Sequence, residues 1–209
     1  EGDYVKQNKT NLKSYEYGNP VPWKISVDQL DEKQKEWLLE SKTFCMYPWI
    51  HFNVSPDGNA TPCCATDNVA NGPLGNTHQQ TLEEIWNCPK QKQLRVDMLS
   101  GTPNEYCKRC YEHEDAGFFS MRQSANKHFG HLSDRVHETK SDGTFDRYEM
   151  VYWDIRFSNL CNLRCRSCGH GYSSSWYKDQ AALAGPEWAK QNKPLLIAGR
   201  DPDERTKRL

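Results

Sequence analysis

Nine cysteines constrain this chain more than any other feature of its 209 residues. An odd number cannot pair completely into disulfides within one chain, and most of these residues lie in tight groups, as metal ligands do. Grouped thiolates are soft ligands suited to zinc or iron–sulfur clusters, and they need a reducing compartment to stay free. We therefore expect a cytoplasmic metal-binding protein, with a secreted disulfide scaffold as the alternative. The cysteines are Cys45, Cys63, Cys64, Cys88, Cys107, Cys110, Cys161, Cys165 and Cys168.

The remaining composition excludes several classes of partner. The chain is 36% hydrophobic and 11% aromatic, which predicts a folded protein with a modest core. Its net charge of −1 provides no general attraction to nucleic acid or to an anionic membrane. No apolar run is long enough to cross a bilayer. The sequence opens on Glu1, so we expect the true N-terminus to be missing.

The first half of the chain predicts a small α+β region. Residues 1–26 are polar and are expected to form an extended arm, and residues 27–41 have the pattern of an amphipathic helix. Apolar and polar residues alternate over 50–54, as in a strand with one apolar face. The turn signal Ser55-Pro56-Asp57-Gly58 follows, so a hairpin would bring Cys45 and Cys63 toward the same end.

Helices are predicted after the hairpin. They cover 82–86 and 90–100, and a further helical segment opens at Cys107 and reaches about Phe129. Glu114 fits a solvated face of that segment, and nothing in the sequence assigns a role to Arg122. Residues 131–149 are charged and contain few apolar residues, which predicts a linker.

A strand is predicted immediately before the last three cysteines. Apolar and polar residues alternate over 150–157, and a helix is expected from Trp176 to about Ala184. The cysteines thus occupy a loop between a strand and a helix, where α/β folds place their chemistry. Asp154 and Arg156 would face the interior of a barrel or form an ordinary ion pair at an edge.

Cys161, Cys165 and Cys168 have C-x3-C-x2-C spacing. Three thiolates at this spacing can hold three corners of a cubane cluster from one loop, and no fourth cysteine follows. The fourth iron would then keep an open site, which distinguishes a reactive metal centre from a structural one. The alternative is a zinc knuckle or a structural iron–sulfur site that borrows a distant cysteine.

This triplet resembles the signature of the radical S-adenosylmethionine (SAM) superfamily. The resemblance implies that the three cysteines hold a catalytic [4Fe–4S] cluster and that SAM binds the open iron. Cleavage of SAM then produces a 5′-deoxyadenosyl radical that abstracts hydrogen from a substrate. It also places Asn162, Ser167 and Gly169 beside the cofactor. Ser167 departs from the hydrophobic or aromatic residue that is usual there, which weakens the expected packing of the adenine.

The upstream cysteines resemble the SPASM and shorter twitch modules, which hold auxiliary iron–sulfur clusters in radical SAM enzymes. The similarity rests on Cys45-x12-Gly58-x4-Cys63 and on Cys107-x2-Cys110. It implies that Cys45, Cys63, Cys107 and Cys110 hold a second [4Fe–4S] cluster. Cys64 could replace Cys63, and a closed zinc site of the ribbon type is the alternative. Cys88 is interpreted as a small buried hydrophobic residue.

The resemblance covers roughly residues 27–184 and implies an α/β fold. A small α+β cysteine-rich twitch/SPASM-like module would precede the start of a partial (β/α) radical SAM barrel. The expected regions are an arm at 1–26, the auxiliary-cluster module at 27–130, a linker at 131–149 and a truncated radical SAM domain at 150–209.

The implied function is that of a radical SAM enzyme acting on an unidentified small molecule or peptide. Its reductant would be a protein such as flavodoxin or ferredoxin. Only 41 residues follow Cys168, and the family's Gly-Gly-Glu segment is absent, so we expect a fragment that binds clusters better than it turns over substrate. The alternatives are a non-catalytic zinc or iron–sulfur module and an electron-transfer protein.

Overall fold

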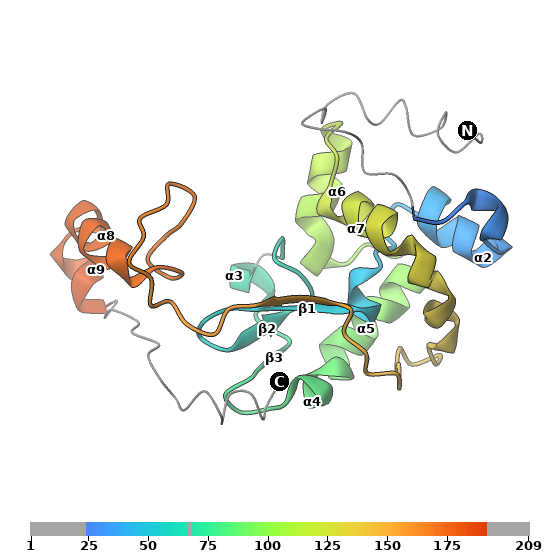
Figure 1. Cartoon of the computed structure of the whole chain (residues 1–209), viewed down its shortest axis with the longest axis horizontal. Helices are drawn as coiled ribbons and strands as arrows, with labels where there is room; N and C mark the ends of the chain where they lie inside the picture. Colours follow the sequence, from blue (N-terminus) through green and yellow to red (C-terminus); the bar gives the residue numbers. More distant parts are fainter. Residues whose placement is uncertain (1–23, 67, 192–209) are drawn as a thin grey trace.

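A computed structural model describes residues 24–66 and 68–191 of the chain (Figure 1). These residues form a mixed α/β structure with a small four-stranded sheet and several helices. The predicted arm up to residue 23 and the predicted barrel region beyond residue 191 lie outside the described residues. The largest fully buried side chains include Phe44, Trp49, Phe52 and Trp86.

The sheet has the strand order β3-β2-β1-β4. Strands β1 (His51–Val54) and β2 (Asn59–Thr61) form the predicted antiparallel hairpin, and Gly58 in the turn has a φ of +85°. Strand β3 (Gly75–Asn76) pairs with β2. Strand β4 (Tyr152–Ile155) pairs parallel to β1, with His51 opposite Tyr152. The strand that leads to the last three cysteines is therefore part of the same sheet as the hairpin.

Both faces of β1 are buried, whereas the alternation in the sequence predicts one apolar face. His51 is 1% exposed and stacks on Tyr152, with ring centroids 4.5 Å apart, while Tyr47 contacts its ring at 4.7 Å. Asn53 donates to Thr61 Oγ1 at 3.1 Å and accepts from Arg156 Nη1 at 2.8 Å. Stacking and hydrogen bonds thus satisfy the polar side chains that the pattern assigns to solvent.

The helix predicted over 27–41 covers only 32–40, where an α-helical turn continues directly into a π-helical turn, and a separate 3₁₀ turn precedes it. These elements are the 3₁₀ turn η1 (Val27–Gln29), the α-helical turn α2 (Glu32–Lys35) and the π-helical turn η2 (Glu36–Glu40). Asp31 interrupts the run because its side chain accepts from the Gln34 amide at 2.8 Å and caps α2.

The helices after the hairpin follow the predicted order, but the last predicted segment is broken in two. Gly117, with a φ of +81°, ends the first part, and Ser120 caps the second by accepting from the Gln123 amide at 3.1 Å. The helical elements described between residues 47 and 129 are η3 (Tyr47–Trp49), α3 (Asn68–Asn71), α4 (Leu82–Trp86), α5 (Pro89–Leu99), η4 (Glu105–Cys107), α6 (Lys108–Asp115) and α7 (Met121–Phe129).

The segment predicted as a linker packs against the core. It begins with the 3₁₀ helix η5 (Gly130–Glu138), and Val136 and Phe145 are buried. Arg95 of α5 fixes the later part, since its guanidinium donates to Gly143 O at 3.2 Å and lies 5.6 Å from the centroid of the Phe145 ring. It also donates to Pro48 O at 3.0 Å and to Trp86 O at 2.9 Å. One buried arginine thereby orders a stretch that is poor in apolar residues.

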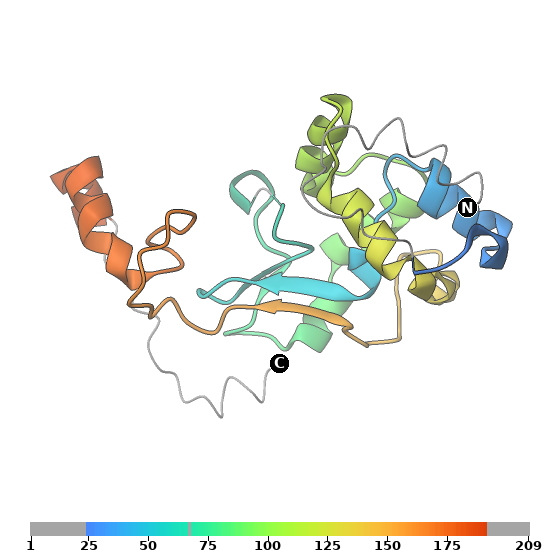
Figure 2. The same cartoon turned by 45° about the horizontal axis from the view of Figure 1, so that its top comes forward.

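The last described elements lie to one side of this body, at the left of Figures 1 and 2. They are η6 (Ser174–Trp176), α8 (Tyr177–Ala184) and α9 (Pro186–Gln191). A loop that contains the last three cysteines connects β4 to them. Among the described residues, no helix has both the length and the apolar character needed to span a bilayer.

Candidate metal centres

Four cysteines from three parts of the fold form the first candidate centre. Cys45 precedes η3, Cys63 follows β2, Cys107 ends η4 and Cys110 lies in the first turn of α6. Burial raises the pKa of the Cys45 thiol well above its usual value, and the neighbouring thiols of Cys107, Cys63 and Cys110 raise it further. Cys45 belongs to the buried core, Cys63 and Cys107 pack against that core, and Cys110 is buried on α6, so these four side chains lie in one region of the fold.

The other thiols of this centre are affected in the same way. Burial, and then the nearby Cys110 thiol, raise the pKa of Cys63 to about 12. The pKa of Cys107 is raised by burial and then by Cys63 and Cys110. Burial also raises the pKa of Cys110, but the backbone amide of Arg122 opposes this rise. Thiols in such surroundings favour the neutral form until a metal compensates their charge.

The four thiols are neighbours, but they are not drawn together around one point. Within residues 24–66 and 68–191, no three His, Cys, Asp or Glu side chains are close enough to hold a single metal ion. A four-iron cluster needs its thiolates further apart than a single ion does, because the iron and sulfide atoms of the cluster lie between them.

The remaining cysteines of this region have different neighbours. Cys64 is exposed. Partial desolvation of its thiol, and then Asp154 of β4, raise its pKa, while Arg156 lowers it. Cys88 occupies the N-cap position of α5 without a side-chain capping hydrogen bond, and it is half-buried against the core, whereas the sequence interpretation has it buried. The charge of its thiol acts on Arg95 and Tyr106.

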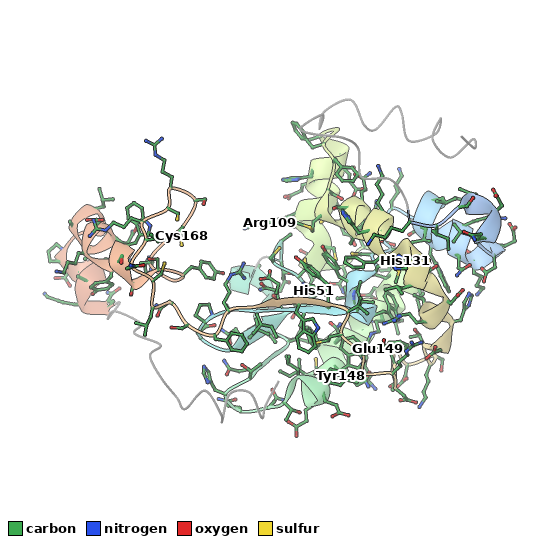
Figure 3. All side chains as sticks on the ribbon, in the orientation of Figure 1. His51, Arg109, His131, Tyr148, Glu149 and Cys168 are labelled. Atoms are coloured by element: carbon green, nitrogen blue, oxygen red, sulfur yellow. The ribbon has the colours of Figure 1, made fainter. Side chains whose placement is uncertain are left out.

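The cysteine triplet forms the second candidate centre. Cys165 is exposed, and Cys161 and Cys168 are half-buried. Figure 3 places Cys168 in the loop beside α8, away from His51 in the sheet. The predicted cofactor contacts Asn162, Ser167 and Gly169 are all exposed on the same loop.

Side chains around η6 hold the backbone of this loop. Ser175 Oγ donates to Cys161 O at 2.6 Å, and Ser173 Oγ donates to Leu163 O at 2.8 Å. Trp176 Nε1 donates to Cys165 O at 3.3 Å. The sequence gives no sign of these contacts, because the partners are backbone carbonyl groups that no motif identifies.

β4 connects the two centres. The Arg156 side chain pairs with Asp154 at 3.1 Å, and its guanidinium lies 5.0 Å from the centroid of the Tyr172 ring, beyond the triplet. The same pair lies beside Cys64. Asp154 and Arg156 are therefore an ion pair on a sheet strand, between the hairpin region and the loop.

One polar residue near the first centre differs from its sequence interpretation. Glu114, expected on a solvated helix face, has only 16% of its side chain exposed and pairs with Arg122, whose side chain is 7% exposed. An isolated glutamate on a helix looks the same in sequence whether it faces water or an arginine from another helix.

Comparison with known proteins agrees with the first centre. A family model for the SPASM iron–sulfur cluster-binding domain matches residues 45–111. The matched segment begins at Cys45 and contains Cys63, Cys107 and Cys110. Domains of this type occur in radical SAM proteins and bind iron–sulfur clusters. No curated protein and no solved structure matches the chain.

Proposed function

We propose that this chain is the cluster-binding part of a cytoplasmic radical SAM enzyme with two [4Fe–4S] clusters. The observation that carries the proposal is the SPASM match over residues 45–111, within which Cys45 and Cys110 are buried and Cys63 and Cys107 are half-buried, in a structure whose sheet leads directly to the C-x3-C-x2-C loop. The substrate, a small molecule or a peptide, and a flavodoxin- or ferredoxin-like reductant belong to the same proposal.

The residues of the first centre fit an auxiliary cluster. Cys45, Cys63, Cys107 and Cys110 would provide the four thiolates of a closed cubane, with Cys45 and Cys110 buried and Cys63 and Cys107 half-buried. Cys63 is proposed as the ligand in preference to Cys64, because Cys63 packs against the same core as Cys45 and Cys107, whereas Cys64 is exposed.

The triplet fits a cluster with one open iron. Cys161, Cys165 and Cys168 provide three thiolates on a partly exposed loop, which leaves room for a small cofactor. When bound, such a cluster with SAM supplies a 5′-deoxyadenosyl radical. The chain's own contribution is to hold the loop through Ser173, Ser175 and Trp176. Asn162, Ser167 and Gly169 remain the proposed SAM contacts.

The start of a barrel is also part of this proposal. β4, the triplet loop and α8 form a strand–loop–helix unit with the cysteines after the carboxyl end of the strand. That is where parallel α/β folds place their active sites. The parallel pairing of β4 with β1 makes the unit continuous with the SPASM sheet.

Anaerobic reconstitution with iron and sulfide tests the proposal. We expect about eight irons per chain and about four in Cys161→Ala/Cys165→Ala/Cys168→Ala, because each cubane contains four irons. A variant with Cys45→Ala, Cys63→Ala and Cys107→Ala should also retain about four. Cys64→Ala and Cys88→Ala are the matched controls and should bind as much iron as the unmodified chain.

Electron paramagnetic resonance (EPR) then separates the functional classes. Adding SAM should change the EPR spectrum of every chain that keeps the three triplet cysteines. It should leave the spectrum of Cys161→Ala/Cys165→Ala/Cys168→Ala unchanged. A spectrum that is insensitive to SAM would favour a two-cluster electron carrier. Full occupancy by zinc, with no visible absorption from a cluster, would overturn the proposal.

A further inference from the structure

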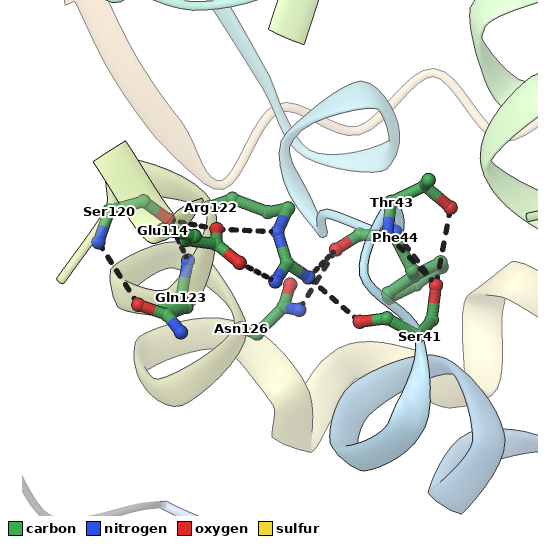
Figure 4. Close-up of polar contacts among 8 residues, drawn as sticks. All are labelled: Ser41, Thr43, Phe44, Glu114, Ser120, Arg122, Gln123 and Asn126. Atoms are coloured by element: carbon green, nitrogen blue, oxygen red, sulfur yellow. Dashed lines mark hydrogen bonds and ion pairs between the residues drawn. The ribbon is translucent and has the colours of Figure 1, made fainter. Parts of the chain in front are cut away.

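Helix α7 holds the backbone on both sides of Cys45, and Figure 4 shows its contacts with Ser41 and Phe44 on the preceding side. Arg122 Nη1 donates to the carbonyl oxygens of Ser41 and Phe44, each at 3.0 Å. Asn126, one turn further along α7, donates to Phe44 O at 3.0 Å and accepts from the Met46 amide at 3.0 Å. The peptide groups that flank Cys45 are thus fixed by two side chains of one helix.

The same arginine is fixed to the helix that carries Cys110. Its Nε donates to Glu114 Oε1 at 2.9 Å, and its Nη2 pairs with the other carboxylate oxygen. Ser120 Oγ donates to the same carboxylate at 2.5 Å. Glu114 lies one turn after Cys110 on α6, so the ion pair links the segment of Cys45 to the helix of Cys110.

The pair also lies within electrostatic reach of the thiols. Burial lowers the pKa of Arg122, but Glu114 outweighs this effect, and negative charge on Cys45 and Cys110 raises the pKa further. The backbone amide of Arg122 in turn lowers the pKa of Cys110. Because both side chains are largely buried, water screens this interaction little.

We propose that Arg122 and Glu114 are positioning residues that preform the four-thiol centre and set the charge beside it, and thereby the reduction potential of its cluster. The inference rests on the proposed function, since it concerns the auxiliary cluster. A reduced cluster carries one more negative charge, so a nearby cation favours reduction and a nearby anion opposes it. In the intact pair, the effects of Arg122 and Glu114 on the reduction potential nearly cancel. Removing either charge should leave the effect of the other uncompensated.

Stability alone gives a weak account of this pair. Buried ion pairs are often no more stabilising than apolar residues of similar volume. Its bonds go to the peptide groups beside one candidate ligand and to the helix of another, which is the arrangement that orients ligands around a centre.

The test uses the full chain carrying Cys161→Ala/Cys165→Ala/Cys168→Ala, so that only the auxiliary cluster contributes. Its potential is measured by EPR-monitored redox titration. Arg122→Gln should lower the midpoint potential, Glu114→Gln should raise it, and the double variant should return close to the parent. We expect each single shift to be of the order of a tenfold change in the equilibrium constant, about 59 mV for a one-electron couple.

Arg122→Lys separates charge from position. It keeps the cation, so the potential should stay near that of the parent. It loses the planar fork that reaches Glu114 and two carbonyl groups at once, so a chelator should remove iron faster. Lys140→Gln and Asp146→Asn, in a surface ion pair, are the matched controls and should change neither quantity.

Equal potentials in the single variants and the parent, with the cluster intact, would overturn the inference and leave the proposed function standing. Shifts of the same sign in both single variants would also overturn it, because a general loosening of the fold has no reason to reverse with charge. If Arg122→Gln takes up no cluster, the midpoint potential of Glu114→Gln alone tests the inference: a higher potential than that of the parent supports it, and an equal or lower one overturns it. A parent chain that takes up no iron overturns both the inference and the function.

Discussion

His51 is a residue whose burial should make the stability of the whole chain depend on pH. Its ring stacks against Tyr152 and Tyr47, and its Nδ1 lies 3.0 Å from Tyr152 O. Burial lowers the pKa of His51 from 6.5 to about 4, against smaller opposing effects of the Tyr152 hydrogen bond and of Asp154. The folded chain therefore holds a neutral imidazole at pH values where the unfolded chain already binds a proton.

We predict that this difference destabilises the fold as the pH falls. Between pH 6.5 and 4 the unfolded state binds more protons, so the free energy of unfolding decreases with decreasing pH. Over the interval from pH 6.5 to pH 5 the loss should be about 2 kcal/mol. His51→Asn should remove this part of the slope, measured by urea unfolding of chains in the same cluster-loaded state.

His113→Asn, at an exposed position of α6, is the control for this measurement. Its unfolding free energy should follow that of the unmodified chain at every pH. If the His51→Asn chain keeps the full slope between pH 6.5 and 5, the buried imidazole is not its source.

The sequence identifies possible ligands better than it identifies what holds them. Cysteine spacing singles out Cys45, Cys63, Cys107 and Cys110 because thiols are rare and chemically distinct. Arg122 and Glu114 carry no such mark, since charged residues are common on helices and only tertiary packing decides which of them are buried. The ligand set itself remains a prediction, and the reconstitution experiment decides it.

At the scale of elements, Gly143 fixes how the 139–150 segment crosses α5. Its φ is +82°, and a Cβ at this position would overlap the Lys92 carbonyl oxygen. Its own carbonyl oxygen accepts from buried Arg95 at 3.2 Å. Backbone thus lies directly against backbone, and glycine is required both by conformation and by space.

We predict that Gly143→Ala lowers the free energy of unfolding by at least ~3 kcal/mol, because the clash displaces the segment that Arg95 holds. Gly117→Ala is the matched control: its φ of +81° is almost the same, but no atom lies within 4 Å of the added Cβ. That variant should lose only about 1 kcal/mol from backbone strain. If urea unfolding shows that Gly143→Ala and Gly117→Ala lose the same unfolding free energy, the close approach of the Lys92 backbone at Gly143 is refuted.

Local signals in the sequence predict elements where the cause is local. The turn at 55–58 and the helix over 82–86 are found where expected, because local residues determine each: Gly58 in the turn and the Thr81 cap at the start of the helix. The break at Gly117 separates a segment predicted as continuous, and 131–149 packs through Val136, Phe145 and the carbonyl group that Arg95 reaches. The packing of 131–149 depends on α5, which is about 50 residues earlier in the chain, so periodicity cannot reveal it.

At the scale of the whole molecule, the pairing of β4 with β1 joins the two candidate centres. The alternation over 150–157 predicts a strand but not its partner, because parallel pairing depends on residues about 100 positions away. The amides of Val151 and Tyr152 donate to Ile50 O at 2.9 and 3.2 Å, and the amide of Arg156 donates to Val54 O at 2.9 Å. β4 thus covers the edge of the hairpin that would otherwise be open, and its own outer edge carries exposed Trp153.

This pairing predicts that β4 belongs to the folding unit of the first centre. A chain ending at residue 149 would leave β1 with an open edge and His51 without the Tyr152 ring. We expect its melting temperature to be ~10 °C below that of a chain ending at residue 157, which keeps β4. Both chains lack the triplet, so the comparison isolates the strand.

Scanning calorimetry gives the melting temperatures, and size-exclusion chromatography should also find association of the shorter chain through its exposed strand. Identical melting temperatures and elution volumes would mean that the hairpin region folds without β4, and that the two centres are joined only by the chain between them.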